Sequence, residues 1–240
     1  MNSKIPSSQT SGQSGQGQGG AGTDDGGGAA VPPEPIILSY MELRKAVGFI
    51  GFALPVVLAV GKVILQGCGL QDSISSYYYT DMGNVFVGSM CAVGVFLLSY
   101  KGYERADAIA GTLAGIFAVC VALFPTTPAQ DATPGDKAIG MVHLTFAALL
   151  FLTLAYFSLF LFTKSVPNPT DRKRQRNKVY IFCGWTIVGC IVVMAVAAIP
   201  QIKGYLTCRT LRFWFESIAI VAFGVSWLIK GETILKDQNP

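Results

Sequence analysis

Long apolar runs separated by short polar stretches dominate the chain beyond residue 40. A bilayer core about 30 Å thick needs roughly 20 mostly apolar residues in a helix, and six runs approach that length. Backbone amides in hydrocarbon must be satisfied within their own segment, so runs rich in Gly, Ala and Leu favour helices over the alternating strands of a barrel. The sequence therefore predicts an all-α, polytopic bundle of six transmembrane helices. The expected spans are residues 47–65, 82–100, 106–124, 139–162, 179–199 and 213–229.

The residues outside these runs divide the chain into three parts. Residues 1–37 are dominated by Gly, Ser and Gln, which carry too little apolar surface to offset the entropy of ordering a chain. We expect a disordered cytoplasmic tail there. A six-helix transmembrane domain is expected over residues 38–232, followed by a short cytoplasmic tail over residues 233–240.

Composition supports a membrane environment. The chain is 51% hydrophobic and only 13% charged, whereas a soluble domain has about 25% charged residues. The net charge of +4 is too small to favour nucleic acid as a partner. The expected partners are membrane lipids and a small-molecule or lipid ligand, and the sequence leaves the oligomeric state open.

The positions of Lys and Arg predict the orientation. Cytoplasmic loops of membrane proteins are enriched in these residues. Placing both termini on the cytoplasmic side puts all but five of the 18 Lys and Arg residues there, with the dense stretch 170–178 contributing most. The five exceptions are Lys62, Lys137, Lys203, Arg209 and Arg212.

Several features inside the spans are expected to pack or cap helices. Gly111 and Gly115 form a G-x-x-x-G pair, which allows the close approach of two helices. Asp107 falls in the first turn of its span, where a carboxylate complements the helix dipole. Lys62 lies near a span end and can extend its ammonium to the interface.

Aromatic residues near span ends are expected in the interfacial belts, where a ring keeps its polar atom wet. Trp185 lies deeper, so its indole N–H is expected to find a partner inside the bundle or in a cavity. The residues assigned to the belts are Tyr40, Tyr100, Tyr103, Tyr180, Trp214 and Trp227.

Three ionisable residues at one depth are candidates for a shared site. Asp81 precedes the second span, His143 opens the fourth and Glu216 lies early in the sixth, so all three lie toward the outer face. Charged groups at membrane depth are costly and commonly functional. With Tyr78 and Arg212 nearby, they predict an outward-opening polar pocket that binds a ligand. The alternative is that these groups only join helices through hydrogen bonds.

Metal and disulfide chemistry are restricted by the residues available. The single histidine excludes a zinc site of three histidines. No metal or cofactor is expected, and Asp81, His143 and Glu216 are the one set that would otherwise offer ligands. Cys68 and Cys208 both fall in outward-facing loops and are candidates for a disulfide. The other cysteines in or near spans, Cys91, Cys120, Cys183 and Cys190, are expected to behave as small apolar residues.

Some of these features resemble multi-pass proteins of bacterial inner membranes that are classed as domains of unknown function. The shared features are the Ser- and Tyr-rich loop ending at Asp81, Phe124-Pro125 after the third span, His143 and Glu216. The resemblance spans about residues 38–232 and implies an inner-membrane location without implying an activity. The chain resembles the alkaline ceramidase and adiponectin receptor group more loosely. That group places Ser, Asp and several His residues around zinc, and this chain departs from it by having one histidine.

Three functions follow as hypotheses. The favoured one is a membrane protein that binds or moves a small polar or lipid-derived ligand through an outward-facing pocket. The second is a membrane-embedded lipid-modifying hydrolase that uses Asp81, His143 and Glu216 as acid–base groups or metal ligands. The third is an accessory protein whose polar groups serve packing. The sequence specifies neither a substrate nor a reaction, and whether the chain is an enzyme stays open.

Overall fold

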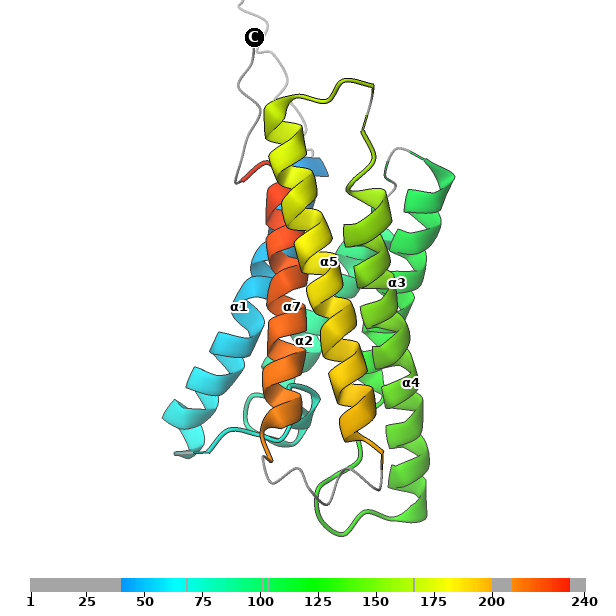
Figure 1. Cartoon of the computed structure of the whole chain (residues 1–240). Helices are drawn as coiled ribbons and strands as arrows, with labels where there is room; N and C mark the ends of the chain where they lie inside the picture. The colour runs from blue at the N-terminus through cyan, green and yellow to red at the C-terminus, as the bar shows by residue number, and fades with distance from the viewer. Residues whose placement is uncertain are drawn as a thin grey trace, which may run out of the picture. The chain divides into compact units, whose positions relative to one another are not determined.

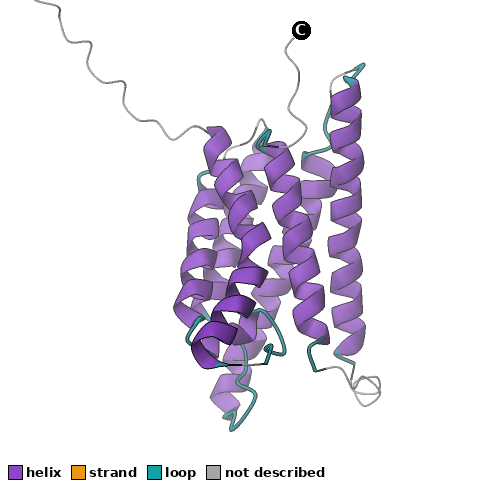
Figure 2. Cartoon of the chain, turned by 90° about the vertical axis from the view of Figure 1, so that its left-hand side faces the viewer, coloured by secondary structure: helices purple, strands orange, loops and turns teal. Residues whose placement is uncertain are grey.

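The computed structural model describes residues 40–67, 69–100, 102, 104–165, 167–199 and 209–233. Over these residues the chain is all-helical, with six helices and no strand (Figures 1 and 2). The predicted all-α class is confirmed, and the two predicted tails lie outside the described residues. The helices are α1 (Tyr40–Gln66), α2 (Gly83–Leu98), α3 (Arg105–Leu123), α4 (Pro134–Tyr156), α5 (Asp171–Ala197) and α7 (Leu211–Lys230). A short 3₁₀ helix, η1 (Ser75–Tyr79), precedes α2, and a π-helical turn, η2 (Phe157–Leu161), continues α4.

Side-chain caps set several helix boundaries. Thr133 accepts a hydrogen bond from the backbone N–H of Asp136 at the start of α4, and Thr170 accepts one from that of Lys173 at the start of α5. At the start of α3, Asp107 Oδ2 accepts from the backbone N–H of Glu104 at 3.0 Å, which confirms the expected capping role of Asp107. These caps satisfy amides that a helix leaves unpaired in its first turn. The Thr170 cap explains why α5 begins earlier than its apolar run and includes charged residues.

The six helices form a ring. Each helix packs on the next along the chain, from α1 to α5, then α5 packs on α7 and α7 returns to α1. Neighbours in the ring run in opposite directions (Figure 1). One end of the ring therefore holds the start of α1, residues 99–100, 162–165 and 167–170 and the end of α7, and we call it the basic end. The opposite end holds residues 69–82 and 124–133, and we call it the tyrosine end.

Glycines permit the closest helix contacts. A Cβ added at Gly115 of α3 would lie 2.8 Å from the carbonyl oxygen of Gly94 in α2, and one at Gly111 would lie 2.9 Å from that of Leu97. The G-x-x-x-G pair therefore packs against α2 inside the bundle, as expected. Gly224 of α7 makes an equally close approach to Gly48 and Phe52 of α1, which closes the ring.

Aromatic rings fill the core near the basic end. Trp227 has its ring centroid within 5.1–5.8 Å of those of Tyr100, Phe157, Phe162 and Phe223. Its side chain is 1% exposed. The rings come from the segment just after α2, from η2 and the residue that follows it, and from α7, so they tie these three parts together.

Several aromatic predictions are therefore wrong. Tyr100, Tyr180 and Trp227 are buried rather than interfacial, and Trp185 is 63% exposed on the outside of α5 rather than inside the bundle. Position along a span predicts how deep a residue lies in the membrane. Whether its side chain points into the bundle or toward lipid depends on how the helix packs against its neighbours. Trp214 is exposed near a helix end, as expected, and Tyr40 and Tyr103 have no described side chain.

Among the described residues, five helical segments are long and apolar enough to cross a membrane: Met41–Gln66, Arg105–Leu123, Pro134–Leu161, Asp171–Ala197 and Leu211–Lys230. Many large apolar side chains on these helices, such as Phe49, Ile64 and Phe182, are exposed on the outer surface of the ring. An apolar exterior of this kind is stable in lipid and unstable in water.

Candidate functional site

A cavity of about 90 Å³ lies inside the ring of helices. Its walls come from α1, α2, α3, α4 and α7 and from residues 73–75. Most of the wall is apolar, and the polar side chains belong to residues at or near the tyrosine end. The apolar wall includes Ile50, Leu54, Phe86, Met90, Val93, Leu150, Phe151, Leu154 and Phe223. The polar side chains are those of Ser73, Ser75, Thr126, His143, Arg212 and Glu216.

Glu216, on α7, holds the loop that precedes α2. Its Oε2 accepts a hydrogen bond from the backbone N–H of Ile74 at 2.7 Å. One turn earlier, the backbone N–H of Phe213 donates to the carbonyl oxygen of Asp72 at 2.9 Å. The carboxylate of Glu216 thus lines the cavity and also holds the segment that closes it.

His143 is placed by the end of α3. The side chain is 3% exposed and lines the cavity. Its Nδ1 lies 2.7 Å from the carbonyl oxygen of Phe124. Because a carbonyl oxygen only accepts, Nδ1 carries the proton of this hydrogen bond, and in a neutral ring Nε2 is then the acceptor.

The tyrosine-rich segment closes the cavity at the tyrosine end. Tyr79 donates its hydroxyl proton to the carbonyl oxygen of Thr126 at 2.6 Å, which links η1 to the connection between α3 and α4. Partial burial, with smaller contributions from Asp136 and Tyr78, raises the pKa of Tyr79, so its phenol stays a donor at neutral pH. Residues 72–80 are therefore attached to α7 on one side and to residue 126 on the other.

The cavity brings together part of the predicted site. His143, Arg212 and Glu216 line it. Asp81 is exposed and is not part of the lining, and Tyr78 is half-buried with its ring against Tyr79 at a centroid distance of 5.1 Å. Depth along the membrane predicted one layer for Asp81, His143 and Glu216, but Asp81 lies in the turn after η1 and is exposed outside the cavity. This removes one of the three groups on which the hydrolase hypothesis depends.

Sequence reasoning did not single out two backbone partners of the site. The N–H of Ile74 and the carbonyl of Phe124 position Glu216 and His143, respectively. Both are backbone atoms of apolar residues, so the residue type does not indicate that they form these hydrogen bonds. The Ser- and Tyr-rich composition of residues 73–79 was the only indication that this segment contributes to the site.

Within the described residues, no group of three or more His, Cys, Asp or Glu side chains lies close enough to hold a metal ion. Cys91, Cys120, Cys183 and Cys190 are free, with Cys183 and Cys190 buried among apolar residues. The predicted disulfide between Cys68 and Cys208 lies outside the described residues.

The hydrogen bond from the Ile74 N–H to Glu216 leads to a prediction for backbone dynamics. Glu216→Ala removes the acceptor of the Ile74 N–H and should raise the hydrogen-exchange rate of residues 72–80 by about tenfold, the effect of losing about 1.4 kcal/mol of local stability. Glu216→Gln keeps an acceptor oxygen and should change exchange much less. Equal exchange in wild type and Glu216→Ala would show that the carboxylate does not hold the loop.

The apolar ring, its five long apolar helices and its internal cavity define a multi-pass α-helical membrane protein. Comparison with known proteins adds no closer assignment. No family model, curated protein or solved structure matches the chain.

Proposed function

We propose that the chain crosses a cell membrane six times, with both termini in the cytoplasm, and binds a small amphipathic ligand in its central cavity. The observation that carries this proposal is the convergence of His143, Arg212 and Glu216 on one cavity whose remaining wall is almost entirely apolar. Ligand sites typically combine an apolar wall with a few convergent polar groups.

The sixth span is α2. Its 16 residues extend only about 24 Å at 1.5 Å per residue, less than the roughly 30 Å of a bilayer core. However, α1 and α3 both run from the basic end to the tyrosine end, so the chain must return between them, and α2 is the segment that does so. Along its length, α2 packs between α1 and α3. A proposed inner-membrane location follows from the resemblance to inner-membrane proteins.

Orientation follows from the charge at the two ends. Reporter fusions should place residues 164–178 in the cytoplasm and residues 200–212 outside. A fusion to a reporter that is active only outside the cytoplasm should be inactive at residue 168 and active at residue 205. The reverse result would invert the proposed topology.

The chemistry of the lining indicates the kind of ligand. Ser73, Ser75 and Glu216 offer oxygen acceptors, Arg212 offers a cationic donor and His143 offers a ring nitrogen. A polar head group held at this end would direct its chain toward the apolar wall near Leu54, Phe86 and Leu154. We infer that the ligand has a hydrogen-bonding head and a short apolar chain, as a lipid fragment does.

The proposal is tested with three probes that share a short chain and differ in their head: propanol, propylamine and propanoate. Protein in phosphatidylcholine nanodiscs should show a raised unfolding temperature with at least one of them, since a ligand that binds only the native state stabilises it. Ala147→Phe should abolish the shift by filling the cavity, whereas Ala148→Phe, on the exposed side of α4, should retain it. The absence of a shift with all three probes, or equal shifts in both variants, would contradict the proposed function.

A further inference from the structure

A strap of residues 72–80 closes the central cavity at the tyrosine end. Ser73, Ile74 and Ser75 of this strap line the cavity. Apart from Thr126, the other lining residues lie on helices, where a ladder of backbone hydrogen bonds holds each segment in shape. The strap contains only the short helix η1, so its position depends on hydrogen bonds and side-chain packing with its neighbours.

On the α7 side, two hydrogen bonds and buried side chains hold the strap. The carbonyl oxygen of Asp72 accepts from the backbone N–H of Phe213 at 2.9 Å. The backbone N–H of Ile74 donates to Glu216 Oε2 at 2.7 Å. The side chains of Ile74 and Tyr77 are almost fully buried, and the ring centroid of Tyr77 lies 6.1 Å from that of Phe213. This side of the strap is therefore anchored.

Toward α3 and α4, an exposed hydrogen bond holds the strap. Tyr79 donates its hydroxyl proton to the carbonyl oxygen of Thr126 at 2.6 Å, and its side chain is 49% exposed. Water competes for the partners of an exposed hydrogen bond, so such a bond opens more readily than the buried packing against α7. Thr126 itself lines the cavity, so breaking this bond separates the strap from a residue of the cavity wall.

Packed aromatic rings close the cavity in the direction of the basic end. On α4 and α7 the cavity lining ends at Leu154 and Phe223. About one turn further toward the basic end lie Phe157 and Trp227, which are at most 1% exposed and have ring centroids 5.6 Å apart. A ligand that left in this direction would have to displace these large rings from a close-packed core.

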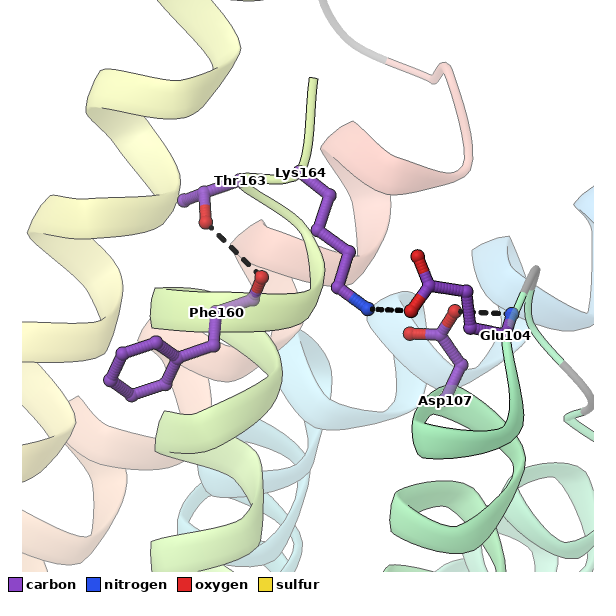
Figure 3. A network of polar contacts seen from close by, with 5 residues as sticks. All are labelled: Glu104, Asp107, Phe160, Thr163 and Lys164. Atoms are coloured by element: carbon purple, nitrogen blue, oxygen red, sulfur yellow. Dashed lines mark hydrogen bonds and ion pairs between the residues drawn. The ribbon is translucent and has the colours of Figure 1, made fainter. Parts of the chain in front are cut away.

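Connections at the basic end are also joined to their neighbours. Nζ of Lys164, in the connection after η2, lies 2.8 Å from Oε2 of Glu104 at the start of α3 (Figure 3). Lys173 Nζ of α5 donates to the carbonyl oxygen of Phe162 at 2.8 Å. An exposed ion pair such as Lys164–Glu104 stabilises this end only weakly, so the aromatic rings are the main obstacle to movement there. In the part of the chain that the structure describes, the strap is the less firmly held of the two closures.

We propose that the strap is the gate of the central cavity. Its Tyr79 side separates from Thr126, a small ligand enters or leaves at the tyrosine end, and the hydrogen bond then forms again. This inference rests on the ligand binding proposed for the cavity. It implies that the ligand exchanges on one side of the membrane, the outer side in the proposed topology. The cavity then binds its ligand and does not conduct it across.

The rates at which a probe binds and dissociates test the gate. Wild type and Tyr79→Phe are compared by NMR in phosphatidylcholine nanodiscs, with isotope-labelled propanol, propylamine or propanoate, whichever stabilises wild type. Tyr79→Phe keeps the ring and removes the hydroxyl donor, so the strap should open about tenfold more often, the effect of losing one hydrogen bond. Both rates should rise by that factor. Kd should stay within about twofold, because the closed strap remains the main state.

Tyr156→Phe is the matched control. Tyr156 is an exposed tyrosine at the end of α4, near the basic end, so this change should leave both rates within about twofold. Hydrogen exchange of residues 72–80 is measured on the same samples and should rise in Tyr79→Phe by the same factor as the probe rates. The proposal is overturned if strap exchange rises while the probe rates do not, which would indicate a lateral path between helices, or if neither changes. The absence of binding by any probe in wild type would contradict the function proposed for the cavity, and with it the gate.

Discussion

Trp227→Ala is expected to destabilise the protein by about 3–5 kcal/mol, the range for removing a large buried aromatic side chain. Trp227 is 1% exposed and touches four other rings. Its neighbours belong to the segment after α2, to η2 and the residue after it, and to α7, so they cannot all move inward to fill the space. The resulting cavity would weaken the contact between α7 and the rest of the ring.

Trp185→Ala is the matched control for this prediction. Trp185 is 63% exposed on α5, so its removal leaves no internal cavity and should change stability by less than about 1 kcal/mol. Both variants are compared by the denaturant concentration or temperature that unfolds half of the protein in detergent. Similar losses in the two variants would show that the aromatic cluster is not the core that the structure describes.

Gly224→Ala should destabilise the contact between α1 and α7 by about 1–3 kcal/mol, because overpacking forces backbone shifts. A Cβ at this position would lie 2.5 Å from the backbone nitrogen of Phe52 and 2.8 Å from the carbonyl oxygen of Gly48. Both obstacles are backbone atoms, which have no rotamer that moves them away. The two helices must therefore separate, and this opens the ring.

Gly88→Ala supplies the corresponding control on α2. Outside the neighbouring backbone of its own helix, no described atom lies within 4 Å of a Cβ added there, so the change should be neutral or stabilising by up to about 1 kcal/mol through the higher helix propensity of Ala. Thermal unfolding of the two variants measures the difference. A Gly224→Ala variant as stable as Gly88→Ala would contradict the close packing of α1 on α7.

Periodicity and hydropathy predicted the helices well because both depend on local sequence. The apolar run 106–124, for example, coincides closely with α3 (Arg105–Leu123). The same runs could not predict which face of a helix points inward. Trp185 and Trp227 have the same chemistry, yet one is exposed and the other buried, because only Trp227 meets rings from other segments.

For the candidate site too, the sequence predicted how deep a residue lies in the membrane but not which way its side chain points. His143 and Glu216 were singled out because charge at membrane depth is costly, and both line the central cavity. Asp81 satisfied the same criterion but lies on the exposed side of a turn, whose geometry is not encoded in residue type alone. The cavity itself arises from packing among five helices, which no single segment of sequence reveals.

The stretch 170–178 illustrates what charge counting leaves out. It was interpreted as a signal for topology, for which only the total matters. In the structure its members differ: Lys173 and Arg176 line a cavity at the basic end of the ring, whereas Arg174 and Lys178 are exposed. Helical periodicity separates the two groups, but the residues they meet on α1 and α7 are known only from the fold.

The most direct test of a ligand cavity inside the ring is to identify what the protein carries from its own membrane. Small molecules are extracted from purified wild-type protein, Ala147→Phe and Ala148→Phe, and quantified by mass spectrometry. The account predicts an amphipathic molecule in near-stoichiometric amount in wild type and Ala148→Phe, and its loss in Ala147→Phe. The same molecules in the same amounts from all three proteins would contradict a ligand site in the central cavity.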